Sequence, residues 1–202
     1  MPTSLEAALG ADAPNTPATG FTVAIGGWAH GSIGTAGEAD DYLFTLTSAG
    51  RFLFDALENQ EQNTYWSLVG PRGQEVLSRN FYNSDAAYIG AEAVLDLPAG
   101  TYRLRLNKDA GTIGNYSFRL IDLSAADSLT LGVEATGTLD PARASRAYRF
   151  TGTAGQELVF DRASQSGTGY GILARLIDPF GRVLVQNIPI TASGVLTLPV
   201  SG

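Results

Sequence analysis

Apolar side chains recur at every second position in two similar stretches of the chain. The first stretch, residues 38–55, has its alternating apolar side chains at Tyr42, Phe44, Leu46, Phe52 and Phe54. The second stretch, residues 144–161, repeats this order at an offset of 106 residues, from Tyr42 to Tyr148. A period of two is typical of β-strands that lay one face on a core. Each stretch is therefore predicted to form a strand, a short turn at Ala-Gly and a second strand.

Two turns of the same chemistry follow these stretches. Residues 65–69 lead into the turn Gly70-Pro-Arg-Gly73, and residues 175–177 lead into the turn Asp178-Pro-Phe-Gly181. Proline fixes φ where a type I or II turn requires it, and glycine follows at the last position. Both turns are predicted to close β-hairpins.

A further strand pair is predicted at residues 101–106 and 115–120. Its alternation directs six side chains to the core, namely Tyr102, Leu104, Leu106, Tyr116, Phe118 and Leu120. We expect the two strands to form a hairpin, which would gather Arg103, Arg105 and Arg119 on its outer face. Such arginines usually protect a sheet edge and aid solubility, and an anion site is the less common alternative.

Length and repeat together predict two tandem domains. The chain has 202 residues with 24 Gly and 9 Pro, a composition that favours an all-β sandwich over a helical protein. An offset of 106 residues is one domain length. We expect a lead-in at residues 1–10, a first antiparallel β-sandwich at residues 11–123 and a second at residues 124–202. The second sandwich repeats the strand order up to residues 195–202 but lacks a counterpart of the last hairpin.

The missing hairpin predicts a partner for the second domain. Without the six inward side chains, a marginally stable domain would lose much of its core and expose an unpaired strand edge. Either the natural protein continues past Gly202 into neighbouring segments, or a second chain donates the strands. The lead-in residues 1–20 and the strand Phe21–Ile25 are the candidate donors.

Composition and charge exclude several classes of function. The chain has no cysteine, so disulfides, a thiolate zinc site and a cysteine nucleophile are excluded. Its one histidine, His30, cannot form a multi-histidine metal centre, and 13 basic against 20 acidic residues give a net charge of −7. This charge disfavours nucleic acid and anionic membranes as partners, and no stretch is long enough for membrane insertion. The amino terminus does not match a secretory signal, so we expect another export signal or a fragment of a larger protein.

Several short motifs occur in order along the first domain. They are Gly31-Ser-Ile, Asp40-Asp-Tyr-x-Phe-x-Leu, Leu97-Pro-Ala-Gly-Thr-Tyr-x-Leu and Asn115-Tyr-Ser-Phe. Together they resemble bacterial pre-peptidase C-terminal domains, over nearly all of residues 11–123 and less closely over residues 124–202. The resemblance implies a jelly-roll-like β-sandwich that serves as a non-catalytic accessory module of secreted or cell-surface proteins. In some such proteins the module binds calcium or a matrix polymer.

The resemblance also points to a calcium site in the first domain only. In calcium-binding relatives an acidic lead-in folds against the acidic turn before the first long strand, which maps here to Asp12, Asn15, Glu38 and Asp40. Calcium takes about six to eight oxygen ligands, which carboxylates, carbonyls and water can supply. The alternative is that these are solvated turn and capping carboxylates. At the position of Asp40 the second domain has Arg146, which cannot bind a cation, and we expect it to pair with a nearby carboxylate.

An irregular stretch, residues 79–90, carries aromatic side chains. Phe81, Tyr82 and Tyr88, with Trp66 nearby, would form a stacking platform for a glycan or a matrix protein. The alternative is that half-buried aromatics support a long loop. The sequence leaves both interpretations open.

No catalytic constellation is visible in the sequence. His30 has no serine and aspartate arranged around it, and Asp55 and Asp161 recur at one repeat position, which is typical of a framework role. We therefore expect no enzymatic activity. The leading hypothesis is a structural or adhesive module of a larger secreted or cell-surface bacterial protein. The alternative is an accessory domain that holds a polysaccharide or matrix protein for a secreted hydrolase.

Overall fold

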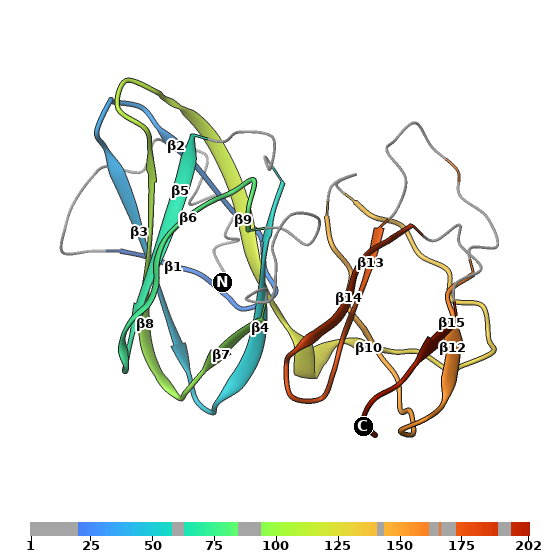
Figure 1. Ribbon diagram of the computed structural model, residues 1–202. Coiled ribbons are helices and arrows are strands. Elements are labelled where there is room, and N and C mark those ends of the chain that lie inside the picture. Colours follow the sequence, from blue (N-terminus) through green and yellow to red (C-terminus); the bar gives the residue numbers. More distant parts are fainter. Residues whose placement is uncertain are drawn as a thin grey trace, which may run out of the picture.

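Two parts of the chain lie side by side in the computed structural model (Figure 1). We call them the N-terminal sandwich (residues 20–122) and the C-terminal part (residues 123–202). The structure describes residues 20–57, 63–84, 94–140, 144–161, 166, 173–189 and 195–202. The predicted all-β fold is confirmed, because the described elements are strands apart from one 3-10 turn, η1 (Leu123–Ala125). Within these residues, no helix is long and apolar enough to cross a membrane.

The first sheet of the N-terminal sandwich has the strand order β1-β3-β8-β5-β6. Its strands are β1 (Phe21–Thr22), β3 (Ala39–Leu46), β8 (Gly100–Lys108), β5 (Thr64–Gly70) and β6 (Gly73–Asn80). All neighbours are antiparallel except β1, which runs parallel to β3. The central strand β8 therefore joins β3 to β5.

The second sheet has the strand order β2-β9-β4-β7. Its strands are β2 (Ala29–Ile33), β9 (Gly114–Asp122), β4 (Gly50–Ala56) and β7 (Val94–Leu97), all antiparallel to their neighbours. Alternating apolar residues of both sheets face each other and form one core. In this sheet, β9 is the strand that joins β2 to β4.

Stacked aromatic rings occupy the centre of this core. The ring of Phe54 on β4 lies between those of Trp66 and Phe118, at centroid distances of 4.1 and 5.4 Å. Each large apolar side chain buried in this way contributes about 1.5–3 kcal/mol. The period of two along β4, β5 and β9 puts these rings on the inner faces of opposing sheets.

Residues 101–106 and 115–120 form strands that do not pair with each other, so the predicted hairpin is wrong. The prediction of which side chains point inward is confirmed. The six predicted side chains are buried in the core, namely Tyr102, Leu104, Leu106, Tyr116, Phe118 and Leu120. However, β8 belongs to the first sheet and β9 to the second, so the chain crosses from one layer to the other between them. Alternation assigns an inward face to a strand but does not choose its neighbour.

The three arginines predicted to cluster are therefore separated. Arg105 on the first sheet donates two hydrogen bonds to Asp41, with Nε–Oδ1 and Nη2–Oδ2 distances of 2.8 and 2.7 Å. Arg119 on the second sheet pairs with Asp55. Arg103 is exposed on the first sheet. The predicted common outer face of these arginines is wrong, because their strands lie in different layers.

The C-terminal part contains three separate two-stranded sheets among its described residues. They pair β10 (Asp127–Ser128) with β11 (Tyr148–Arg149), β12 (Glu157–Val159) with β15 (Val195–Thr197), and β13 (Leu173–Ile177) with β14 (Val183–Pro189). Leu158 on β12, Leu176 on β13 and Leu198 form a small buried cluster. Among the described residues this cluster is smaller than the core of the N-terminal sandwich.

Both predicted Pro-Gly turns close antiparallel hairpins. Gly73 closes the β5–β6 turn and Gly181 the β13–β14 turn, with φ values of 92° and 87°, which glycine adopts without strain. In the second turn the carboxylate of Asp178 accepts hydrogen bonds from the backbone N–H of Phe180 and of Arg182. These bonds hold the pKa of Asp178 below its usual value, against the opposing effect of burial.

One predicted strand donor is already in use within the N-terminal sandwich. Phe21 lies opposite Tyr42 in the β1–β3 pair, and Val23 is buried in the core. Within the single chain the segment Phe21–Ile25 therefore belongs to the first core, and its role as a strand donor to a second chain stays a prediction. Residues 1–19 lie outside the described residues.

Candidate functional site

The best-defined polar group in the core of the N-terminal sandwich is the carboxylate of Asp40. Asp40 on β3 is 2% exposed, and its Oδ2 accepts a hydrogen bond from the hydroxyl of Tyr116 on β9. The Tyr116 hydroxyl also lies 2.8 Å from that of Tyr42. Each phenol has one proton, so Tyr42 donates to Tyr116 while Tyr116 donates to Asp40. We call these three residues the buried carboxylate network.

The Asp40 carboxylate is only half satisfied by this network. Its Oδ1 is buried and has no hydrogen-bond partner among the residues that the structure describes. Burial raises the pKa of Asp40 to about 6, the hydrogen bond from Tyr116 lowers it in part, and the nearby charges of Glu38 and Asp41 raise it further. Asp40 is therefore a buried acid with no compensating cation among its described hydrogen-bond partners.

Glu38 lies beside Asp40 and orders the turn before β3. Its Oε2 accepts hydrogen bonds from the backbone N–H of Gly34 and of Thr35, both at 2.8 Å. This geometry matches the capping interpretation of Glu38. The position also suits a cation, because the nearby Asp40 has a buried oxygen without a partner.

The predicted calcium ligands are thus only partly brought together by the described structure. Glu38 is close enough to Asp40 for its charge to raise the pKa of Asp40. Asp12 and Asn15 lie outside the described residues. Among the residues that the structure describes, no group of three or more His, Asp or Glu side chains is placed to hold a metal ion. The residues present fit a cation in charge, while the two described carboxylates alone supply too few oxygens for calcium.

The predicted aromatic platform does not form as expected. Trp66 and Phe81 are both 0% exposed. Trp66 donates from its indole nitrogen to Ser84 Oγ at 2.6 Å, and Phe81 packs edge-on against Phe54. For these two residues the predicted ligand-stacking role is wrong, because their rings lie in the core. Tyr82 is half-buried, and Tyr88 lies outside the described residues.

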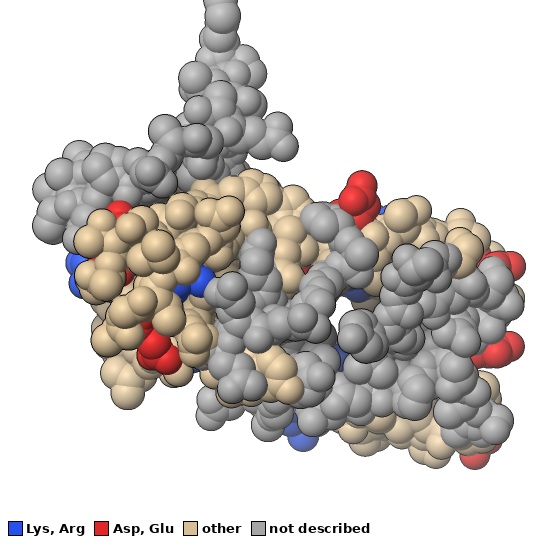
Figure 2. Space-filling view, turned by 90° about the horizontal axis from the view of Figure 1, so that it is seen from above, with Lys and Arg blue, Asp and Glu red and all other residues tan. Residues whose placement is uncertain are grey.

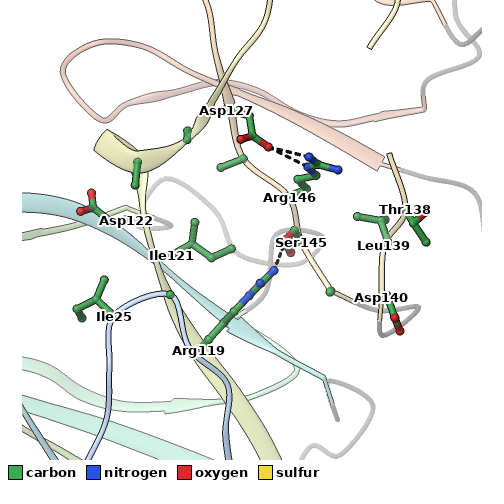
Figure 3. Close-up of a pocket in the computed structure, with 15 residues that line it drawn as sticks. Ile25, Arg119, Ile121, Asp122, Asp127, Thr138, Leu139, Asp140, Ser145 and Arg146 are labelled. Atoms are coloured by element: carbon green, nitrogen blue, oxygen red, sulfur yellow. Dashed lines mark hydrogen bonds and ion pairs between the residues drawn. The ribbon is translucent and has the colours of Figure 1, made fainter. Parts of the chain in front are cut away.

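A cavity of about 600 Å³ lies at the junction between the N-terminal sandwich and the C-terminal part (Figure 3). Ile25, Arg119 and Ile121 line it from the sandwich, and Leu139 and Arg146 line it from the C-terminal part. Sequence reasoning missed this site, because it depends on how the two parts dock.

A buried ion pair anchors one wall of this cavity. Arg119 Nε donates to Asp55 Oδ2 at 2.7 Å, and Arg119 Nη2 donates to the backbone carbonyl of Ser145. The backbone N–H of Ser145 in turn lies 3.2 Å from both oxygens of Asp55. The guanidinium of Arg119 also lies over the ring of Trp28, 4.4 Å from its centroid. We call Asp55, Arg119 and Ser145 the junction clamp, because it joins the two parts.

The clamp explains the framework role predicted for Asp55. Its side chain is almost fully buried, and burial raises the pKa of its carboxyl against the lowering effect of Arg119. A second contact joins the two parts, since Arg51 on β4 donates to the carbonyl of Pro179 in the β13–β14 turn. The predicted pairing of Arg146 is confirmed, because its Nη2 lies 2.8 Å from Asp127 Oδ2.

A histidine and a serine lie together on the outer face of the second sheet. His30 on β2 stands opposite Ser117 on β9, and its Nδ1 lies 2.8 Å from Ser117 Oγ. The sequence did not predict this pair, because the strands are far apart along the chain. Ser117 is 6% exposed and does not line the junction cavity. The pair therefore joins two strands and lies outside the junction cavity.

Comparisons with known proteins find solved structures of low similarity and no matching family. No family model matches the sequence, and no curated protein sequence matches it. One similar solved structure is the pre-peptidase C-terminal domain of a collagenase from Bacillus anthracis, at 20% identity and a TM-score of 0.39, with 53% of this chain and 99% of that chain covered. Another is PliG, a periplasmic inhibitor of g-type lysozyme from Salmonella Typhimurium, at 16% identity and a TM-score of 0.37, with 50% and 97% covered. At this level of similarity, neither structure assigns a function to the chain.

Proposed function

We propose that this chain is a non-catalytic structural or adhesive β-sandwich module of a larger secreted or cell-surface bacterial protein. The observation that carries the proposal is the use of charged groups at the junction cavity. Four of the charged residues that line it, Arg119, Asp122, Asp127 and Arg146, are bonded within the protein. They hold strands, turns and the two parts together. Catalysis needs instead a base or nucleophile directed at bound substrate.

The described surface agrees with a module that does not bind polyanions. On the face drawn in Figure 2, basic and acidic residues are scattered among uncharged ones and form no continuous basic patch within the described part. The net charge of the whole chain is −7. A nucleic acid or an anionic membrane would meet repulsion from this charge. An accessory role toward protein or glycan neighbours is compatible with it.

The alternative is a module that binds a polysaccharide or matrix protein through the loop aromatics. With Trp66 and Phe81 in the core, this alternative depends on Tyr82 and Tyr88. Both tyrosines belong to the stretch that the sequence singled out. The alternative therefore has a smaller contact surface than the sequence predicted.

A glycan and matrix-protein array tests the two proposals. We expect no specific ligand, as for a purely structural module. Specific binding that is lost in Tyr82→Ala or Tyr88→Ala, and kept in the control Tyr65→Ala on β5, would instead establish the binding module. Substrate turnover that depends on one carboxylate would contradict both proposals.

Calcium is proposed as a stabilising ligand of the first domain, held by Asp12, Asn15, Glu38 and Asp40. The supporting observation is the buried Oδ1 of Asp40, which has no partner. When bound, the cation would supply positive charge to a carboxylate whose pKa is raised by burial. The cation would link the lead-in to β3. Its role would be to stabilise the fold and would involve no reaction on a substrate.

A thermal melt tests this calcium proposal. A ligand that binds only the folded state stabilises it by RT ln(1 + [L]/Kd), so millimolar calcium should raise the Tm and a chelator should reverse the change. Asp40→Ala should remove the gain, while the exposed control Asp96→Asn should keep it. An unchanged Tm in calcium, or an equal gain in Asp40→Ala, would overturn the assignment.

A further inference from the structure

The short sheets of the C-terminal part keep the strand register of the N-terminal sandwich. Phe21 lies opposite Tyr42 in the sandwich, and Asp127 lies opposite Tyr148 at the matching place in the C-terminal part. Likewise, Leu53 lies opposite Val94 in the sandwich, and Val159 lies opposite Val195 in the C-terminal part. The β10–β11 sheet thus corresponds to β1–β3, and the β12–β15 sheet corresponds to β4–β7. Because a slip of one residue would turn every side chain to the other face, shared register means a shared arrangement of inward faces.

The central strands are what the C-terminal part lacks among its described residues. In the N-terminal sandwich, β8 joins β3 to β5 and β9 joins β2 to β4. In the described C-terminal part, no strand joins β11 to β13 or borders the second edge of β12. Residues 135–139, which correspond to β2, are not in a strand. This is expected, because the one partner of β2 in its sheet is β9.

Apolar side chains that a central strand would cover are exposed in the C-terminal part. Tyr148 is 39% exposed, whereas the corresponding Tyr42 is 1% exposed. Val159 on β12 is 59% exposed, whereas the corresponding Leu53 is half-buried. Tyr148 and Val159 thus lie on β11 and β12, the strands next to the positions that β8 and β9 occupy in the sandwich.

Gly202 stands where a counterpart of β8 would begin, at a position that no described strand fills. Its N–H donates to the carbonyl of Gly152 at 3.0 Å, and the N–H of Gly152 donates back at 2.7 Å. In the sandwich, the corresponding pair is Leu46 and Gly100, where β8 begins beside β3. Gly202 has thus formed the first pair of the ladder that β3 and β8 form in the sandwich.

Gly202 also meets the neighbouring turn as Gly100 does. A Cβ added at Gly100 would lie 2.2 Å from Pro71 in the β5–β6 turn. A Cβ added at Gly202 would lie 1.9 Å from Pro179 in the β13–β14 turn. The backbone at Gly202 therefore points between β11 and β13, as Gly100 does between β3 and β5. A counterpart of β8 would lie there.

We propose that the C-terminal part is an acceptor for a two-strand segment that is joined to Gly202. The first strand passes between β11 and β13 and the second pairs with the free edge of β12. The segment alternates apolar and polar residues, as β8 and β9 do, and its apolar side chains cover Tyr148 and Phe150. The recognition is by backbone ladders and by alternate side chains, as in strand addition to a sheet edge.

An extension of the chain with its own strands tests the proposal. Residues 101–123 are fused after Gly202, and hydrogen exchange is measured at β11, β12 and β13. We expect exchange at these strands to slow by at least about tenfold relative to the original chain. The N-terminal sandwich serves as the internal reference, since its exchange should not change.

A matched extension separates strand insertion from added length. In it the six inward residues are replaced by serine, namely Tyr102, Leu104, Leu106, Tyr116, Phe118 and Leu120 of the added copy. This extension should give no protection. Equal protection by both extensions would overturn the proposal. The proposal would also be overturned if β11, β12 and β13 of the original chain, without any extension, already exchanged as slowly as the N-terminal sandwich. Equal protection by a separate peptide of residues 101–123, at equimolar concentration, would overturn the part of the proposal that joins the segment covalently to Gly202.

Discussion

Replacement of Asp40 by asparagine should change how stability depends on pH. The side chain is buried, and its Oδ1 has no partner. Burial is the largest cause of a pKa of about 6, compared with an ordinary value of 3.8. Asparagine has nearly the same shape and still accepts the hydrogen bond from Tyr116. It cannot ionise, so the substitution removes the charge and leaves the packing in place.

The sign of the effect follows from the raised pKa. Between pH 3.8 and about 6 the folded state binds the proton of Asp40 more tightly than the unfolded state, so the free energy of unfolding falls as pH rises through this window. A shift from 3.8 to about 6 corresponds to about 3 kcal/mol. Relative to D40N, the original protein should therefore lose most of this free energy between pH 4 and pH 7.

Urea denaturation of both proteins at a series of pH values, with a chelator present, measures this difference. The raised pKa of Asp55 and the lowered pKa of Asp178 act in both proteins, so they cancel in the comparison. At pH 7 the D40N variant should be the more stable protein, and at pH 4 the two should be nearly equal. A stability difference that does not vary with pH would refute the reasoning, as would an Asp40 carboxyl that titrates below pH 4 by NMR.

Three further predictions concern packing and the junction. Trp66→Ala should lower the free energy of unfolding by about 3–5 kcal/mol; a urea midpoint that does not move would contradict its place in the core. Gly31→Ala places a Cβ 2.2 Å from the Tyr116 hydroxyl, so it should cost about 1–3 kcal/mol, whereas Gly34→Ala, at an exposed position, should change the Tm little. Asp55→Ala leaves the part-buried guanidinium of Arg119 without its carboxylate and should cost about 3 kcal/mol; exchange of the Ser145 amide should accelerate, and an unchanged rate would argue against the clamp.

Inward faces could be predicted from the sequence, and strand neighbours could not. The alternation of Tyr102, Leu104 and Leu106 is the same whether β8 pairs with β9 or faces it across the core. Both arrangements bury the same side chains. The choice depends on contacts with β3 and β5, which are distant in sequence and leave no local signal.

The candidate site was predictable to a similar degree. Asp40 was identified from its place before Tyr42, yet its burial against Tyr116 depends on a strand 76 residues away. Phe81 looks like a loop aromatic because nothing local shows that the core reaches it. The junction clamp also escaped prediction, since the backbone N–H and carbonyl of Ser145 form part of it. Such groups carry no residue-type pattern.

The placement of the two indole rings gives the molecule two independent optical reporters. The chain has two tryptophans. Trp66 stacks on Phe54 inside the sandwich, while Trp28 lies under Arg119 beside the junction clamp. In a Trp28→Phe background the remaining emission follows the loss of the sandwich core. In a Trp66→Phe background the remaining emission comes from Trp28. It changes when the guanidinium of Arg119 moves away from that ring, so it reports the separation of the two parts. Stopped-flow fluorescence of these two single-tryptophan proteins would then time undocking and unfolding as distinct events.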